Sequence, residues 1–148
     1  MSKYQHILVA VDLKEKDDNP VSEQAQLLAN ASGAKLSVIH VIEPIYTYGI
    51  APGGELQFDE WEKSIEDTAK KQLKKLCDKL SIPENQQILK IGSPRSLIMN
   101  AAENIGADLI VVGHHGRHGL SAILIGNTAE DMVHRAKCDV LAVHVPND

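Results

Sequence analysis

The chain has 148 residues, of which 43% are hydrophobic and 24% are charged, and its formal net charge is −5. A chain of this length can bury roughly 70% of the surface that its unfolded state exposes, so its core needs no metal or disulfide. The negative charge, with no block of lysine and arginine, argues against contacts to a phosphate backbone, and we expect no nucleic-acid partner.

Apolar runs are short throughout the chain. The longest, ILVAV and LIVVG, fall far below the roughly 20 residues that a membrane-spanning helix needs. The segment MSKYQHILVAVD meets an aspartate and has no small-residue cleavage site, so we expect no signal peptide. These features favour a cytoplasmic protein with no membrane contact, in which Cys77 and Cys138 are free, buried thiols.

Five short segments rich in valine and isoleucine predict β-strands. In chain order they are His6–Val11, Lys35–Val41, Gln87–Ile91, Asp108–Val112 and Asp139–Val145. The first, fourth and fifth are nearly continuous apolar runs, which favours strands covered on both faces.

The first two helical patterns lie before the third strand. Asn19 followed by Pro20 predicts the start of a helix, and Gly33 predicts its end. Apolar residues at spacings of three and four predict a longer amphipathic helix over Leu56–Leu80. The region between them, Glu43–Glu55, predicts an irregular loop that forms either an aromatic flap over a site or a locally packed surface loop.

Two further helices follow the third and fourth strands. Ser93 and Pro94 predict the start of one, which Gly106 ends. Asn127 and Thr128 open the last, with Glu130 in the capping-box position. The alternation predicts one α/β domain over residues 1–148, with a parallel sheet, right-handed crossovers and helices on both faces.

Ligands of open parallel sheets bind beyond the carboxyl ends of the strands. Asp12, Val41, Gly92 and Gly113 stand at or just after such ends. After the fourth strand, glycines precede a helix start, and such backbone can approach an anion closely. The loop has neither the Walker A nor the GxGxxG pattern, so its spacing leaves a phosphate site and a structural turn equally open.

Histidines in the same loop raise the alternative of a metal site. His114, His115 and His118 stand close together in sequence. Zinc needs three or four converging ligands, and the loop has no carboxylate or cysteine to complete the set. We therefore expect no metal here. Motif spacing also yields no nucleophile with a base and an orienting group, so catalysis beyond slow ATP hydrolysis is not expected.

The pattern Gly113-x2-Gly116-x9-Gly126-Asn127, after DLIVV, resembles the nucleotide loop of the universal stress protein family, G-x2-G-x9-G-(S/T). The segments HILVAVD, VIHV, GSPRSLI and DVLAVHV also fall where that family has equivalents. The resemblance therefore covers essentially the whole chain.

The resemblance implies a three-layer α/β/α sandwich whose five-stranded parallel sheet, half of a Rossmann-like arrangement, has the order 3-2-1-4-5. It also implies a homodimer and an adenine nucleotide (ATP, ADP or AMP). The apolar segment 139–145 predicts an edge strand through which two chains would pair. Hydrolysis of bound ATP would need Mg²⁺. Asp12 would contact ribose or adenine, the backbone of Val41 would contact adenine, and the glycines would cradle phosphates. The implied binding residues are Val11, Asp12, Val41, Val112, Gly113, His115, Gly116, Gly126, Asn127 and Thr128.

Three departures from the family pattern bear on nucleotide binding. Asn127 replaces the hydroxyl residue, although its amide can still cap and donate. The acidic segment LKEKDDN follows Asp12 instead of a short Gly-Ser turn, and GHH resembles a branch whose members often bind no nucleotide. Two functions stay open: a nucleotide-binding homodimeric sensor or switch read by an unknown signalling partner, and a nucleotide-free interaction dimer.

Overall fold

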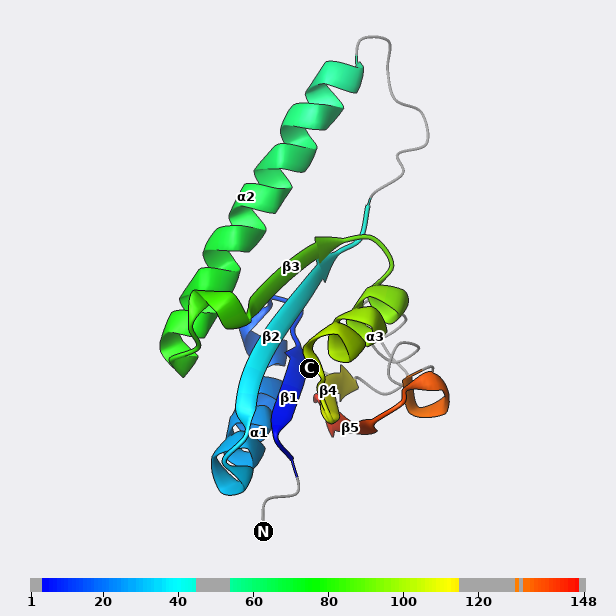
Figure 1. The fold of residues 1–148 in the computed structure, drawn as a ribbon. Coiled ribbons are helices and arrows are strands. Elements are labelled where there is room, and N and C mark those ends of the chain that lie inside the picture. The colour runs from blue at the N-terminus through cyan, green and yellow to red at the C-terminus, as the bar shows by residue number, and fades with distance from the viewer. Residues whose placement is uncertain (1–3, 45–53, 115–129, 131, 147–148) are drawn as a thin grey trace.

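The computed structural model describes residues 4–44, 54–114, 130 and 132–146. Five parallel strands form one sheet in the order β3-β2-β1-β4-β5, as expected (Figure 1). The strands are β1 (His6–Ala10), β2 (Lys35–Ile42), β3 (Gln87–Ile91), β4 (Leu109–His114) and β5 (Asp139–His144).

β1, β2 and β5 each end within one residue of the predicted position, whereas β4 differs in length and β5 in burial. β4 runs two residues past Val112, because the backbone of Gly113 and His114 pairs with β5 even though neither residue adds an apolar side chain. β5 has the expected composition, yet its side chains are exposed or half-buried. It lies at the edge of the sheet. Val140 packs on one face and Leu141 and Val143 pack on the other, so β5 is covered on both faces only in part.

The first helix, α1 (Glu15–Ser32), begins before the predicted start, and Pro20 lies inside it. Asn19 is therefore not the N-cap: its side-chain oxygen instead accepts a hydrogen bond from Lys79 Nζ at 3.4 Å. The sequence preceding Asn19 is acidic, and acidic residues favour the first turn of a helix because they face the positive end of its dipole. The helix ends where expected, at Gly33 in the left-handed conformation.

The other helices agree better with their sequence signals. α2 (Gly54–Leu80) is the long helix, and a short 3₁₀ turn, η1 (Glu84–Gln86), joins it to β3. α3 (Pro94–Ile105) has Ser93 at its N-cap. The Leu97 N–H donates to the Ser93 carbonyl oxygen at 3.0 Å, and the Ser93 hydroxyl makes no capping hydrogen bond. Residues 132–135 are helical before β5, whereas the predicted cap, Asn127 and Thr128, lies outside the described residues.

Helices cover both faces of the sheet (Figure 1). Alternate side chains of a strand point to opposite faces. On one face Ile7, Val9 and Val38 pack with residues of α1 and α2, and on the other Leu8, Ile39 and Ile110 pack with α3. The three central residues of β1, Ile7 to Val9, are thus buried on both faces of the sheet, as the continuous apolar run predicted.

Gly92 begins the turn from β3 to α3 with a φ of 148°, and its N–H bonds Ile42 O at 2.9 Å. A Cβ at Gly92 would lie 2.8 Å from Leu97 Cδ1. We expect Gly92→Ala to lower the free energy of unfolding by about 1–2 kcal/mol through strain and crowding. Gly33→Ala, with a φ of 68° and open space around the new Cβ, is the matched control for conformation alone. Urea unfolding measures both, and equal losses would rule out a contribution from Leu97.

His6 joins three elements at the amino end of β1. Its Nδ1 donates to Ile105 O at 3.1 Å, because a carbonyl only accepts. In the neutral ring Nε2 then accepts from the Ser37 hydroxyl at 2.7 Å. Burial lowers the pKa of His6, with a smaller lowering contribution from Lys35, against the bond to Ile105 and the charge of Asp108, which raise it.

This lowered pKa predicts a pH dependence of stability. The unfolded state, with a histidine pKa of about 6.5, binds a proton before the folded state does as pH falls. The stabilisation is therefore present above about pH 6.5 and is lost as pH falls below it. We expect the free energy of unfolding to drop more between about pH 7.5 and about pH 5 in the wild type than in His6→Gln. Equal drops, measured by urea unfolding, would exclude His6 as the cause.

The cysteines are free thiols in this structure. Cys77 is fully buried as expected, and burial raises its pKa to about 11. Cys138 is half-buried rather than buried, and its pKa is also raised, chiefly by burial. Among the helices of the described part of the chain, none has the length and hydropathy for a membrane span.

Candidate functional site

A cavity of about 400 Å³ lies at the carboxyl ends of β1 and β2, against α2. The described residues that line it come from three segments. They are Asp12 and Leu13 after β1, His40 to Glu43 from β2 onward, and Trp61, Ser64, Ile65, Thr68, Ala69 and Gln72 from α2. This is the edge of a parallel sheet at which ligands of such folds bind.

The segment after β1 holds Asp12 at the cavity. Val11 N donates to Ile39 O at 3.0 Å, which keeps the chain beside β2 beyond the last residue of β1. Leu13 then takes the left-handed conformation, with a φ of 62°, which is unfavourable for a residue that has a Cβ. Its partly buried side chain packs against the core beneath α1 and α2. Strain of this kind persists where packing imposes it, and here it fixes the chain direction beside Asp12.

β2 contributes both backbone and side chains. The side chain of Val41 packs toward α3, on the opposite face of the sheet from α2. Because side chains alternate, His40 and Ile42 point toward α2. Val41 therefore lines the cavity through its backbone, which is the part of this residue that the resemblance implied for adenine.

α2 forms the opposite wall. Its lining residues Trp61, Ile65, Thr68 and Gln72 recur at spacings of three and four, so they share one stripe of the helix. Ala69 from the same helix is buried, whereas Trp61 is 44% exposed, one of few large apolar side chains that remain exposed in the described chain. The wall thus has an apolar base and an aromatic, polar rim.

The structure brings Asp12 and Val41 together at one cavity, and Val11 lies directly beside it. Val112 and Gly113 lie in β4, next to β1, in paired strand backbone. They are not among the described residues that line this cavity. The other expected binding residues lie outside the described residues: His115, Gly116, Gly126, Asn127 and Thr128.

The sequence interpretation did not include His40 or the α2 wall in the site. The Nδ1 of His40 lies 2.7 Å from Val11 O, so the side chain is hydrogen-bonded to the end of β1. Its position one residue before Val41 was the available signal, because alternation turns the two side chains to opposite faces. The stripe from Trp61 to Gln72 was hidden within a helix pattern that also packs on the core.

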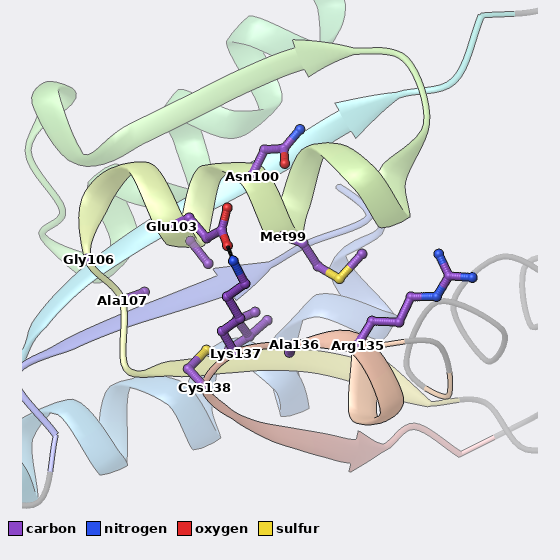
Figure 2. A pocket seen from close by; sticks show the side chains of 11 residues that line it. Met99, Asn100, Glu103, Gly106, Ala107, Arg135, Ala136, Lys137 and Cys138 are labelled. Atoms are coloured by element: carbon purple, nitrogen blue, oxygen red, sulfur yellow. Dashed lines mark ion pairs between the residues drawn. The ribbon is translucent and has the colours of Figure 1, made fainter.

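A second cavity, of about 540 Å³, lies between α3 and the segment before β5 (Figure 2). Figure 2 shows Lys137 reaching across to Glu103, where Nζ and Oε1 are 2.9 Å apart. Gly106 and Ala107 precede β4, and Cys138 precedes β5, so this cavity lies toward the amino ends of the strands. Parallel α/β sheets bind ligands at the other end, which favours the smaller cavity as the functional site.

Within the described ranges, no three His, Cys, Asp or Glu side chains are placed to hold a metal ion. His114 lies at the end of β4, while His115 and His118 lie outside those ranges.

Residues 3–144 match the model of the universal stress protein family. A curated relative, universal stress protein A homolog 2 of Coxiella burnetii, is 41% identical over 145 residues, which cover 98% of each chain. The solved structure of universal stress protein UspA from Lactobacillus plantarum is similar, with a TM-score of 0.76 at 22% identity over 97% of this chain and 99% of that one.

Two similar structures contain nucleotides. One is a universal stress protein in complex with cAMP, with a TM-score of 0.69 at 24% identity over 97% of this chain and 99% of that one. The other is the Archaeoglobus fulgidus protein in complex with dAMP, with a TM-score of 0.60 at 21% identity over 95% and 98%. The chain spans 47% of two longer solved relatives. Its sequence match over nearly its whole length and its sheet order together establish that the chain belongs to the universal stress protein family.

Proposed function

We propose that the chain binds an adenine nucleotide at the carboxyl ends of β1 and β2 and acts as a homodimeric sensor or switch in the cytoplasm. The observation that carries this proposal is the cavity between Asp12, the backbone of Val41 and α2. Its volume, about 400 Å³, lies in the range of small-molecule sites. Free cysteines accord with a reducing compartment.

The charge of the cavity suits the nucleoside part of a nucleotide better than its phosphates. Its described lining contains the carboxylates Asp12 and Glu43, and neither lysine nor arginine is among those residues. Carboxylates accept hydrogen bonds from ribose hydroxyls but repel phosphates. The cavity therefore suits a nucleoside, and the phosphates would extend from it toward the glycine pattern Gly113-x2-Gly116-x9-Gly126.

Solved relatives give independent support for this class of ligand. The universal stress protein with cAMP and the Archaeoglobus fulgidus protein with dAMP hold nucleotides that share adenine and differ in sugar and phosphate. The adenine and its pocket would then be the common part of recognition. The glycine segment, with Asn127 and Thr128, would contact the bound phosphate, and a signalling partner would read the altered surface.

Calorimetric titration of the nucleotide-stripped protein with ATP and Mg²⁺ tests the proposal. We expect one saturable site per chain, with Asp12→Ala weakening ATP binding while leaving the unfolding transition in place. The control is the second cavity: Lys137→Ala removes its exposed ion pair and should leave ATP affinity unchanged. No heat, together with no shift in melting temperature at millimolar ATP, would reject nucleotide binding.

A second candidate function, an interaction dimer without nucleotide, has one observation in its favour. β5 is an edge strand whose side chains are exposed or half-buried, and an unpaired strand edge can pair with its twin. Sedimentation measures the oligomeric state, and calorimetry measures ATP binding. A dimer that binds no ATP would support the interaction function. A monomer that binds ATP would contradict the dimer.

A further inference from the structure

His40 has a fixed orientation at the cavity. Its Nδ1 lies 2.7 Å from the carbonyl oxygen of Val11, and a carbonyl oxygen only accepts, so Nδ1 carries the hydrogen. In a neutral imidazole the other nitrogen, Nε2, is then a hydrogen-bond acceptor. Val11 is itself tied to β2 through its N–H, 3.0 Å from Ile39 O, so the histidine is anchored to paired backbone.

The Nε2 of His40 is not the only hydrogen-bond acceptor among the residues that line this cavity. His40 is half-buried and lines the cavity together with the carboxylates of Asp12 and Glu43. A ligand group that faces these three acceptors must therefore present hydrogen-bond donors. Among nucleosides, adenosine does so with its 6-amino group and its ribose hydroxyls, whereas a 6-oxo purine presents an acceptor at the same place on the base.

Trp61 supplies a flat apolar surface on the opposite wall. It lines the cavity from α2, and 44% of its surface is exposed. Across from α2, the edge of β2 contributes the backbone of Val41 and the ring of His40. A planar base placed between these walls would stack on an aromatic ring and keep its edge toward β2.

We propose that His40 and Trp61 determine base specificity: Trp61 stacks on the purine, and His40 Nε2 accepts from the 6-amino group, which selects adenine over 6-oxo purines. This inference rests on the proposed nucleotide binding. It assigns to the side chain of His40 a role separate from that of the Val41 backbone beside it. A 6-oxo purine would bring its oxygen lone pairs against Nε2, and such a mismatch penalises the wrong ligand without a steric clash.

The test compares ATP with inosine triphosphate, which carries oxygen in place of the 6-amino group, and with N6,N6-dimethyl-ATP, which lacks the donor hydrogens. Calorimetry of the full chain should give about tenfold weaker binding of each analogue, the equivalent of one hydrogen bond of about 1.4 kcal/mol. His40→Asn keeps an amide donor for Val11 O and removes the acceptor at Nε2. In this variant ATP should bind about tenfold more weakly, and inosine triphosphate should bind as tightly as ATP within about threefold.

Trp61 gives a readout that needs no variant, because it is the only tryptophan of the chain. Stacking should quench its fluorescence in a saturable way, with the dissociation constant that calorimetry gives. Equal affinities of the wild type for the three nucleotides, or an undiminished ATP preference in folded His40→Asn, would overturn the role of His40. Binding without any change in Trp61 emission would overturn stacking. Failure of the wild type to bind any of the three would reject the nucleotide site itself, and this inference with it.

Discussion

Thr68→Trp is expected to weaken ATP binding by about 100-fold or more, equivalent to about 2.7 kcal/mol. Thr68 lies on the wall that α2 presents to the cavity, and its side chain is exposed there. An indole at this position would occupy the space between α2 and β2 that the base needs. Because the residue is exposed rather than packed in the core, the substitution should leave the unfolding transition nearly unchanged.

The matched control is Lys70→Trp. Lys70 is on the same helix two residues along, so it points about 200° away from Thr68, and its side chain is 60% exposed. Its single described ion pair, with Glu66 at 3.5 Å, is an exposed pair of small energetic value. Calorimetry with ATP should give wild-type affinity for Lys70→Trp. Equal affinities for both variants would mean that the nucleotide does not enter this cavity.

The sheet could be predicted from the sequence because its signals lie within short segments of the chain. Runs of valine and isoleucine identify buried parallel strands, and all five were found at the predicted places. The helix stops at Gly33 and Gly106 were also correct, since both glycines adopt the left-handed conformation that ends a helix. These features depend on residues close in sequence.

The errors arose where tertiary contacts outweigh local signals. Asn19 followed by Pro20 resembles a helix start, but the N-cap of α1 is Lys14, five residues before Asn19. The extension of β4 to His114 depends on pairing with β5, which no pattern within β4 reveals. The positions of Asp12 and Val41 at the cavity could be predicted because both residues stand at strand ends. The position of Trp61 could not, because it depends on how α2 lies across β2.

Asp108→Ala is expected to lower the free energy of unfolding by about 2–4 kcal/mol. The carboxylate of Asp108 joins the starts of β1 and β4: Oδ2 accepts from Gln5 N at 2.9 Å, and Oδ1 accepts from His6 N at 3.1 Å. Its own N–H donates to His6 O at 2.9 Å. Alanine would leave two backbone donors without their charged acceptor while keeping the backbone bond. Urea unfolding followed by circular dichroism measures the loss.

Asp108→Asn is the matched variant, since an amide has one oxygen that accepts and one nitrogen that donates. It can keep one of the two bonds and turns a donor toward the other N–H, so its loss of stability should fall between wild type and Asp108→Ala. Equal stability of Asp108→Ala and wild type would show that water replaces the carboxylate fully. Because Asp108 lies at the amino end of β4 and the cavity at the carboxyl ends of β1 and β2, the folded variants should keep wild-type ATP affinity. Stability would then depend on the amino ends of the strands and ligand binding on their carboxyl ends. A variant such as Asp108→Ala would change stability without changing ATP affinity.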